Sequence, residues 1–425
     1  MGLADGKAMK NLPLLTVLMI LLTPPATRAG DQKPEENVNS RYTVESAAVA
    51  GIAPDKIGKP LQEEMQKLVG EKYRQEGARE IAGKLRRQFP DYRIAVQVKR
   101  GDRPEHVKVI FAAERVWWKR FEIPLPPVVY HSKQGMSGSV EIPIETHHNV
   151  FTFGAVNSAD ELLERNAGWL FRYEHRKVGT DRVQVRLEFD SFHQKWNPAT
   201  EAALAAAPEV PGVYRWRQNF APSVSVIPFR DLKLSVGTSF QRFQTQYPET
   251  RTETAYSGTA DIQFRHRGSS AGGYRQDIRA GYGLRAATRV LDSDFVYARH
   301  AWTAQYSLTK GKHRFGARFE AGWLTGRAPL FERFSLGDST TLRGWNKFDV
   351  APLGGSRSVH GSLEYRYRPF QIFYDAGRVW DPGPGAETRH GLGFGLTFKD
   401  GGFISLAYPI RLHHVVPVFM LGFRF

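Results

Sequence analysis

Short runs of alternating apolar and polar residues fill the chain from about residue 149 to its end. Residues 183–190 read VQVRLEFD, residues 315–323 read FGARFEAGW, and residues 392–398 read LGFGLTF. Because successive side chains of a strand point to opposite faces, each run predicts a strand with one apolar and one polar or small face. Strands of this kind form either a soluble β-sandwich, with the apolar faces inside, or a membrane barrel, with the apolar faces toward lipid.

The number of such runs favours a closed barrel. We count about nine runs before the polar segment 329–352 and five after it, which gives about fourteen strands. The count rises to about sixteen if residues 116–143 supply two more. An even number lets the first and last strands pair, which removes exposed sheet edges. We therefore predict a mainly β protein, with a transmembrane antiparallel β-barrel of about 14–16 strands over residues 146–425. Residues 114–145 are either a linker or the first barrel strands.

The composition excludes several kinds of site. The chain has no cysteine, so disulfides, thiolate metal sites and cysteine nucleophiles are excluded. The formal net charge is +16, but the arginines are scattered along strands rather than clustered on one helix or arm. This pattern fits a polar lumen or lipid phosphates and not a nucleic-acid partner. The mean hydropathy of −0.42 is that of a soluble protein, so a secreted all-β enzyme stays open on composition alone.

The N-terminus has the order of a secretory signal peptide. Lys7 and Lys10 precede the apolar run Leu12 to Leu22, and prolines and small residues follow up to Ala29. This charged, apolar, small-residue order is typical of a cleaved signal, so we assign residues 1–29 to it. The polar residues 30–40 are predicted to form a flexible leader, and no stretch of the chain is apolar for long enough to form a transmembrane helix.

Residues 41–113 predict a small α+β domain. An extended start at residues 42–44 is followed by helical spacing at residues 60–69 and again at residues 81–89. The period then changes to two over residues 92–98 and 107–111. The resulting order is β-α-α-β-β, and two amphipathic helices behind a hairpin can bury one small core.

Recognised catalytic and metal-binding patterns are weak or absent. Residues 268–272 read GSSAG, but a nucleophile elbow needs a helix after it and strand-like residues follow here. The histidine pairs at 147–148 and 413–414 are adjacent, and neighbours on a strand point in opposite directions. We therefore predict no catalytic residues, no metal site and no cofactor.

The segments 329–352 and 373–380 carry the most specific signal. The first reads PLFERFSLGDSTTLRGWNKFDVAP and the second reads FYDAGRVW. If Tyr365 and Tyr374 face lipid, the alternation places Glu364 and Asp375 on the lumen face. An arginine on an inserted loop, Arg343, would then meet one or both carboxylates, because its planar fork binds a carboxylate through two hydrogen bonds. The alternative is a solvent-exposed loop arginine.

These two segments resemble a known family. The residues FERF at 331–334, Gly337-Asp338, and Leu342-Arg343-Gly344-Trp345 are similar to the sixth extracellular loop of the superfamily of BamA-like and two-partner-secretion proteins. FYDAGRVW is similar to the strand motif that follows that loop. Members often have a glycine pair where Gly337-Asp338 stands, and Tyr or Phe where Trp345 stands. Residues 41–113 resemble the periplasmic POTRA domain of the same superfamily.

The resemblance implies a function in the outer membrane of a bacterial-type cell, with the N-terminal domain in the periplasm. Unfolded outer-membrane or secreted polypeptides would be inserted or passed across without ATP, and outer-membrane lipids and periplasmic or lipoprotein partners would take part. The loop motif would be held by partners on the lumen wall, namely Glu364, Phe373, Asp375 and Gly377.

Two further sites are expected for substrate strands. Strand addition to the N-terminal domain is expected at an exposed edge that includes Val107, Val109 and Phe111. A weak lateral seam is expected between the first and last barrel strands, at Val150, Phe151 and Phe153 on one side and Val416, Pro417, Gly422, Phe423 and Phe425 on the other. Two other functions remain open: a passive porin or receptor with a periplasmic anchor domain, and an outer-membrane barrel enzyme.

Overall fold

The computed structural model describes residues 41–89, 91–117, 121, 128–146, 148–158, 165–207, 212–245, 249–269, 272–383, 386–398, 401–411 and 415–423. The predicted signal peptide and leader lie outside these residues. The chain divides into two units, one made of the described residues up to Gln88 together with Ile94–Ala113, and one made of Phe89–Arg93 and the residues from Glu114 onward.

The N-terminal unit is a three-stranded sheet with two helices. In helices α2 and α3, the apolar residues that recur at helical spacing face the core. Helix α3 buries Ala78, Ile81, Ala82 and Leu85. The order along the chain is the predicted β-α-α-β-β. The elements are β1 (Thr43–Ala50), η2 (Pro54–Lys56), α2 (Lys59–Gln66), α3 (Gln75–Gln88), β2 (Tyr92–Arg100) and β3 (His106–Arg115).

The strand order in this sheet corrects one expectation. The sheet runs β1-β3-β2, with β1 parallel to β3. Val107, Val109 and Phe111 therefore lie on the central strand, where they are 7%, 1% and 0% exposed. The predicted exposed edge at these residues is wrong, because β1 pairs with the edge of β3 that faces away from β2.

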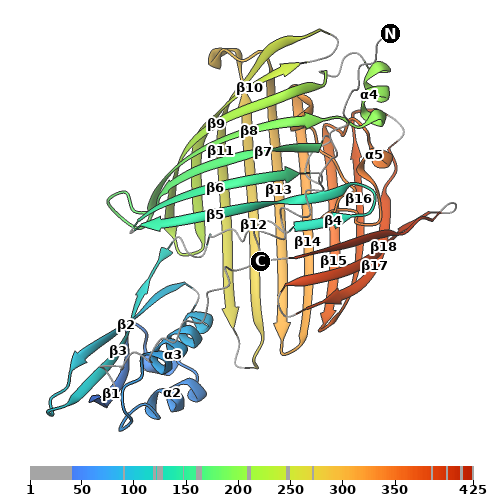
Figure 1. The fold of residues 1–425 in the computed structure, drawn as a ribbon. Coiled ribbons are helices and arrows are strands. Elements are labelled where there is room, and N and C mark those ends of the chain that lie inside the picture. Colours follow the sequence, from blue (N-terminus) through green and yellow to red (C-terminus); the bar gives the residue numbers. More distant parts are fainter. Residues whose placement is uncertain are drawn as a thin grey trace, which may run out of the picture. The chain divides into compact units, whose positions relative to one another are not determined.

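The second unit is a closed antiparallel barrel of sixteen strands, which confirms the predicted fold class (Figure 1). Two strands, β4 and β5, come from the segment 114–145 that the sequence left undecided, and five strands follow the polar segment 329–352 as predicted. The strands are β4 (Val128–His131), β5 (Gly135–Thr146), β6 (Asn149–Ser158), β7 (Arg165–His175), β8 (Val183–Lys195), β9 (Tyr214–Phe229), β10 (Leu232–Thr245), β11 (Arg251–Ser269), β12 (Arg275–Ala287), β13 (Val296–Lys310), β14 (His313–Arg327), β15 (Arg357–Tyr367), β16 (Phe370–Trp380), β17 (Arg389–Thr397), β18 (Gly402–Ile410) and β19 (Val418–Phe423).

The two ends of the barrel differ in the length of their connections. At one end, which we call the turn rim, neighbouring strands are joined by tight turns such as 230–231, 311–312 and 368–369. At the other end, which we call the loop rim, longer connections carry α4 (Pro198–Ala205), η4 (Arg289–Leu291) and the loop 329–352 with η5 (Leu330–Glu332) and α5 (Lys347–Val350). Short turns on one side and long loops on the other are typical of outer-membrane barrels.

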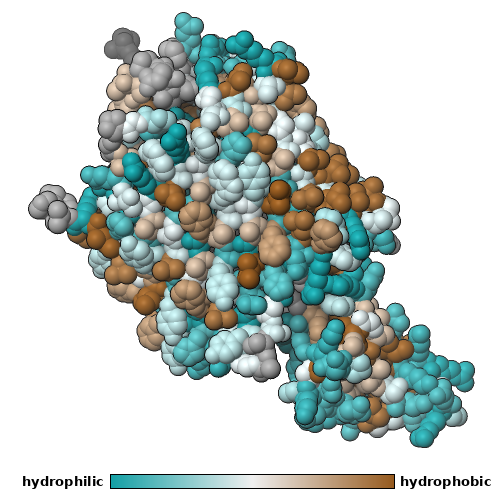
Figure 2. All heavy atoms as spheres, turned by 180° about the vertical axis from the view of Figure 1, so that it is seen from behind, coloured by the Kyte–Doolittle hydropathy of each residue, from teal (hydrophilic) through white to brown (hydrophobic). Residues whose placement is uncertain are grey.

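Apolar side chains cover the outside of the barrel, as the alternation predicts. On β16, Ile372 and Tyr374 are 56% and 37% exposed, whereas Phe373 and Asp375 between them are 3% and 0% exposed. Figure 2 shows brown and pale side chains spread over the barrel wall on one face, with hydrophilic ones among them and at its ends. Among the described residues, none of the helices is long and apolar enough to cross a bilayer.

The core lies inside the barrel, between its wall and the loop 329–352. Loop residues such as Leu330, Phe331 and Leu342 pack against inward-facing wall residues, among them Tyr214 and Phe243. The ring centres of Phe331 and Tyr214 are 5.3 Å apart in an edge-to-face arrangement, a favourable geometry for aromatic pairs. The loop is therefore a packed part of the barrel interior.

Candidate functional site

Arg343 lies on the inserted loop and contacts the inner faces of β15 and β16. Its Nε and Nη2 atoms donate to the two carboxylate oxygens of Asp375, each over 2.8 Å, and its backbone N–H donates to Asp375 Oδ2 over 3.1 Å. Its Nη1 donates to Glu364 over 3.2 Å, and Nη2 also donates to Ser362 Oγ over 3.0 Å. The structure thus brings together the arginine and both carboxylates that the alternation places on the lumen face. We call Arg343, Ser362, Glu364 and Asp375 the arginine lock.

The central pair of the arginine lock, Arg343 and Asp375, is almost completely buried. Arg343 is 5% exposed and Asp375 has no exposed surface. The guanidinium carbon lies 3.5 Å from the centre of the Phe373 ring, which covers one of its faces. Burial disfavours both charges, and each is tolerated because the other supplies charge-assisted hydrogen bonds. Removing one partner of such a pair leaves a buried, uncompensated charge and costs about 3–5 kcal/mol.

Gly344 and Trp345 place the loop backbone directly against the barrel wall. A Cβ atom on Gly344 would lie 2.7 Å from the backbone carbonyl carbon of Tyr408 on β18, so a side chain has no space there. The indole Nε1 of Trp345 donates to the carbonyl oxygen of His390 on β17 over 2.7 Å. Together with the arginine lock, these contacts tie the loop to four consecutive strands, β15 to β18.

Leu342 is buried in a strained backbone conformation. Its φ of 30° lies in the left-handed region, which costs a residue other than glycine about 1–3 kcal/mol. Its side chain packs toward Gly377 on β16, where a Cβ atom would lie 3.4 Å from Leu342 Cγ. The strain is offset by the contacts on both sides of this residue, as is usual at functional sites.

Glu332 forms a second anchor, on β12 and β13, which lie on the other side of β14 from the arginine lock. Its carboxylate accepts a hydrogen bond from Arg285 on β12 and lies 3.6 Å from Arg299 Nε on β13, which also donates to the Glu332 carbonyl oxygen over 2.9 Å. Burial by itself raises the pKa of this carboxyl, but the two guanidinium groups outweigh it and hold the pKa of Glu332 below its ordinary value. The buried carboxylate is therefore charged and strongly held.

Further contacts close the loop on itself and attach it to the first barrel hairpin. Phe334 and Gly355 exchange two backbone hydrogen bonds of 2.9 Å. Gln134, in the turn between β4 and β5, donates to the carbonyl oxygen of Gly337 and to Asn346 Oδ1, the latter over 3.3 Å. The side chain of Gln134 therefore connects the loop to the strand on which the barrel closes.

The barrel closes through a short ladder between β19 and β4, which we call the seam. Over the described residues, β19 and β4 form four residue pairs and β4 and β5 form three, whereas β13 and β14 form fifteen. The inner face of the seam includes the apolar residues Val129, Val418 and Met420 and the buried His131. Within the described residues, β4 therefore has few residue pairs on either side.

The position of the seam corrects part of the prediction. Gly422 and Phe423 lie in it, paired with Val129 and Val128. Val150, Phe151 and Phe153 do not, because they belong to β6, which pairs with β5 and β7. The cause is that β4 and β5 precede them and take the closing position. Val416 and Pro417 come just before β19, and Phe425 lies outside the described residues.

Residues 214–414 match the sequence model of the Omp85 superfamily domain. The chain carries an Omp85 superfamily domain. This confirms the superfamily indicated by the loop and strand motifs. No curated protein sequence matches the chain.

The whole fold also resembles solved structures at low sequence identity. The structure of BamA from Haemophilus ducreyi lacking POTRA domains 1-3 aligns with a TM-score of 0.52 and 14% identity, over 91% of this chain and 85% of that one. CdiB from Acinetobacter baumannii aligns with a TM-score of 0.50 and 12% identity, over 89% and 74% of the two chains. These likenesses concern the fold, and they extend beyond the matched Omp85 domain to the N-terminal unit.

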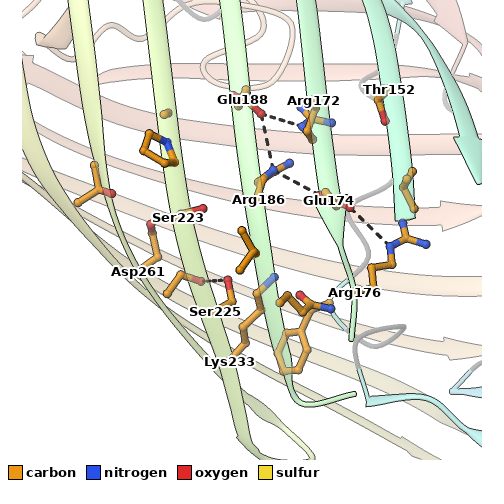
Figure 3. A pocket seen from close by; sticks show the side chains of 18 of the residues that line it. Thr152, Arg172, Glu174, Arg176, Arg186, Glu188, Ser223, Ser225, Lys233 and Asp261 are labelled. Atoms are coloured by element: carbon orange, nitrogen blue, oxygen red, sulfur yellow. Dashed lines mark hydrogen bonds and ion pairs between the residues drawn. The ribbon is translucent and has the colours of Figure 1, made fainter. Parts of the chain in front are cut away.

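Beside the packed loop, the lumen contains a polar cavity of about 510 Å³ on the inner faces of β5 to β12. Figure 3 shows charged side chains alternating along its wall. Glu188 lies 2.7 Å from Arg172 and 3.7 Å from Arg186, and Glu174 lies 3.3 Å from Arg186 and 3.5 Å from Arg176. The wall of this cavity is therefore hydrophilic, with its charges largely compensated.

The patterns judged weak in the sequence fall largely outside the residues that the structure describes. Gly268 and Ser269 lie at the end of β11, while residues 270–271, His147 and the pair 413–414 lie outside the described residues. The described residues contain no group of three or more His, Cys, Asp or Glu side chains that could hold a metal ion. Sequence reasoning missed Glu332 and Gln134 as loop contacts. The acid in FERF was visible, but Gln134 has no recognisable pattern.

Proposed function

We propose that this protein assembles or translocates polypeptides at the outer membrane. The N-terminal domain, on the periplasmic side, receives an unfolded polypeptide. The Omp85 barrel then inserts it or passes it across, and the seam between β4 and β19 provides the lateral opening. No nucleotide is needed, because binding and strand pairing supply the free energy. Periplasmic or lipoprotein partners deliver the substrate.

The observation that carries this proposal is the short seam. Opening it breaks a ladder of four described residue pairs, and each backbone hydrogen bond contributes about 0.5–1.5 kcal/mol net. In lipid, however, an open strand edge has no water to satisfy its polar groups. Any strand that pairs with the exposed edges therefore stabilises the opened seam. An incoming substrate strand can pair with them in this way.

The corrected topology of the N-terminal unit changes where a substrate strand would pair. The outer side of β1 is already occupied at its start, because Gly70 donates to Val44 and Val44 donates to Glu71 over 2.9 Å each. The other edge of the sheet is β2, on which Val98 is 44% exposed. We therefore assign strand addition to the edge of β2 and not to β3.

Cross-linking the seam tests the lateral opening. Tyr130 and Leu421 are directly opposed and both point outward, with exposed fractions of 38% and 41%. The chain has no native cysteine, so Tyr130→Cys/Leu421→Cys can be joined with a short thiol-specific reagent. We expect cross-linked protein in liposomes to lose its acceleration of the folding of a second outer-membrane barrel, and reduction of a cleavable linker to restore it.

The matched control is Val236→Cys/Ala260→Cys, an opposed pair within the long β10–β11 ladder. Cross-linking this pair is expected to leave the acceleration unchanged. Full activity of the protein with a cross-linked seam would disprove lateral opening. A large steady conductance to small solutes, without any acceleration of folding, would instead assign the protein to the passive porins.

A further inference from the structure

The turn rim carries a compact group of exposed cationic residues where β13 to β16 are joined. Lys310 ends β13 and is paired with His313, the first residue of β14. Lys312 lies in the turn between them, and its carbonyl oxygen accepts a hydrogen bond from the backbone N–H of Arg368 in the next turn over 3.4 Å. All four side chains belong to exposed residues. We call Lys310, Lys312, His313 and Arg368 the rim patch.

Tyrosines on the outer face of the barrel surround the rim patch. Lys310 Nζ lies 4.2 Å from the centre of the Tyr274 ring and donates to its hydroxyl over 3.1 Å. His313 Nδ1 is 2.7 Å from the Tyr365 hydroxyl, and its ring centre is 4.9 Å from that of Tyr367. These three tyrosines are 40%, 41% and 44% exposed, respectively. Exposed tyrosines at the end of an apolar barrel wall mark the depth of the lipid headgroups.

Carboxylates do not neutralise this patch within the described part of the chain. None of Lys310, Lys312 and Arg368 has an ion pair with a described residue. The nearest acid along β15, Glu364, is already engaged by Arg343 and Arg366. Among the described residues, these three cations thus lie beside an aromatic border without a counter-charge, and an anion from outside the barrel would supply one.

We propose that the rim patch binds the phosphate-bearing headgroup of an anionic phospholipid. The long stems of the two lysines lie along the apolar wall while their ammonium groups reach the headgroup level. The acyl chains of the lipid run over the apolar side chains above the patch, such as Phe315 on β14 and Ile372 on β16, which are 40% and 56% exposed. A free phosphate would gain the charge contacts but not this apolar contact.

The test uses the full chain, folded in detergent micelles and titrated with phosphatidylglycerol or with phosphatidylcholine of the same acyl chains. Native mass spectrometry counts the bound lipids. We expect the wild type to bind phosphatidylglycerol at least about tenfold more tightly than phosphatidylcholine, because each cation near an anionic headgroup contributes about a fivefold gain. The variant Lys310→Gln/Lys312→Gln/Arg368→Gln is expected to lose this preference, and high salt is expected to weaken it in the wild type.

The matched control is Lys177→Gln/Lys195→Gln/Arg289→Gln, which removes three exposed charges away from the patch and is expected to keep the preference. Heat-modifiable gel mobility confirms that each variant has a folded barrel. Retention of the phosphatidylglycerol preference by the patch variant would overturn the proposal. So would complete displacement of the lipid by millimolar inorganic phosphate, or patch-dependent binding of a glutamate-rich peptide in place of the lipid.

Discussion

The arginine lock and the seam belong to the same barrel wall, but they are held together in opposite ways. The lock depends on one buried cation with several charged and polar partners on β15 and β16. The seam depends on four described residue pairs and a mainly apolar inner face. A buried charge network fails all at once when one member is removed, whereas a short ladder opens one hydrogen bond at a time.

This difference indicates how one barrel combines a fixed loop with an opening wall. The strands that carry the lock, β15 and β16, share eleven residue pairs, so the loop is attached to a rigid section. The seam lies beyond β17 and β18, where β19 and β4 share four described residue pairs. Gln134 is the contact between the two regions, because it belongs to the first hairpin and binds the loop.

The largest expected effect comes from Arg343→Ala, which removes the cation and leaves Asp375 buried and unpaired. We expect the free energy of unfolding to fall by about 3–5 kcal/mol, measured in detergent micelles by urea titration with heat-modifiable gel mobility as the readout. Arg343→Lys is expected to recover only part of this loss, since a lysine lacks the planar fork. The exposed Arg289→Ala serves as the control and should change stability by less than about 0.5 kcal/mol. Equal stability of Arg343→Ala and the control would show that the lock does not hold the loop.

The lock could be predicted from the sequence because its geometry follows from strand periodicity. Glu364 and Asp375 lie on the lumen face since Tyr365 and Tyr374 beside them are outward-facing, and that much is fixed by alternation. Arg343 is central to a recognisable motif. The contact between Arg343 and these carboxylates could therefore be predicted from the sequence, whereas the strained φ of Leu342 could not.

The seam could not be located in the same way. Alternation identifies strands, but the identity of the closing strand depends on the total count, and β4 is only four residues long in a proline-rich segment. The same limitation explains the wrong edge in the N-terminal unit. Val107 and Phe111 are clearly on a strand by their spacing, yet whether that strand is central depends on β1, which pairs with it from more than fifty residues away.

A smaller effect is expected from Gly344→Ala, which tests how closely the loop fits the wall beside the lock. The added Cβ atom would lie 2.7 Å from the backbone of Tyr408, so the loop or β18 must shift. Overpacking of this kind costs about 1–3 kcal/mol, measured by the same urea titration. Gly258→Ala on β11 is the control, because a Cβ atom there meets nothing within 4 Å. A loss at position 258 as large as that at 344 would show that the close approach is not the cause.

The smallest expected effect comes from Gln134→Ala, and it separates the two regions most sharply. Losing the hydrogen bonds to Gly337 and Asn346 should cost about 1 kcal/mol. The remaining contacts of Arg343 still hold the loop, so hydrogen–deuterium exchange should become faster in β4 and β19 and stay slow at residues 342–345. Gln263→Ala on β11 is the matched control and should change neither region. If exchange at residues 342–345 rises as much as in β4, the loop and the seam open together as one cooperative unit, and the contrast between them fails.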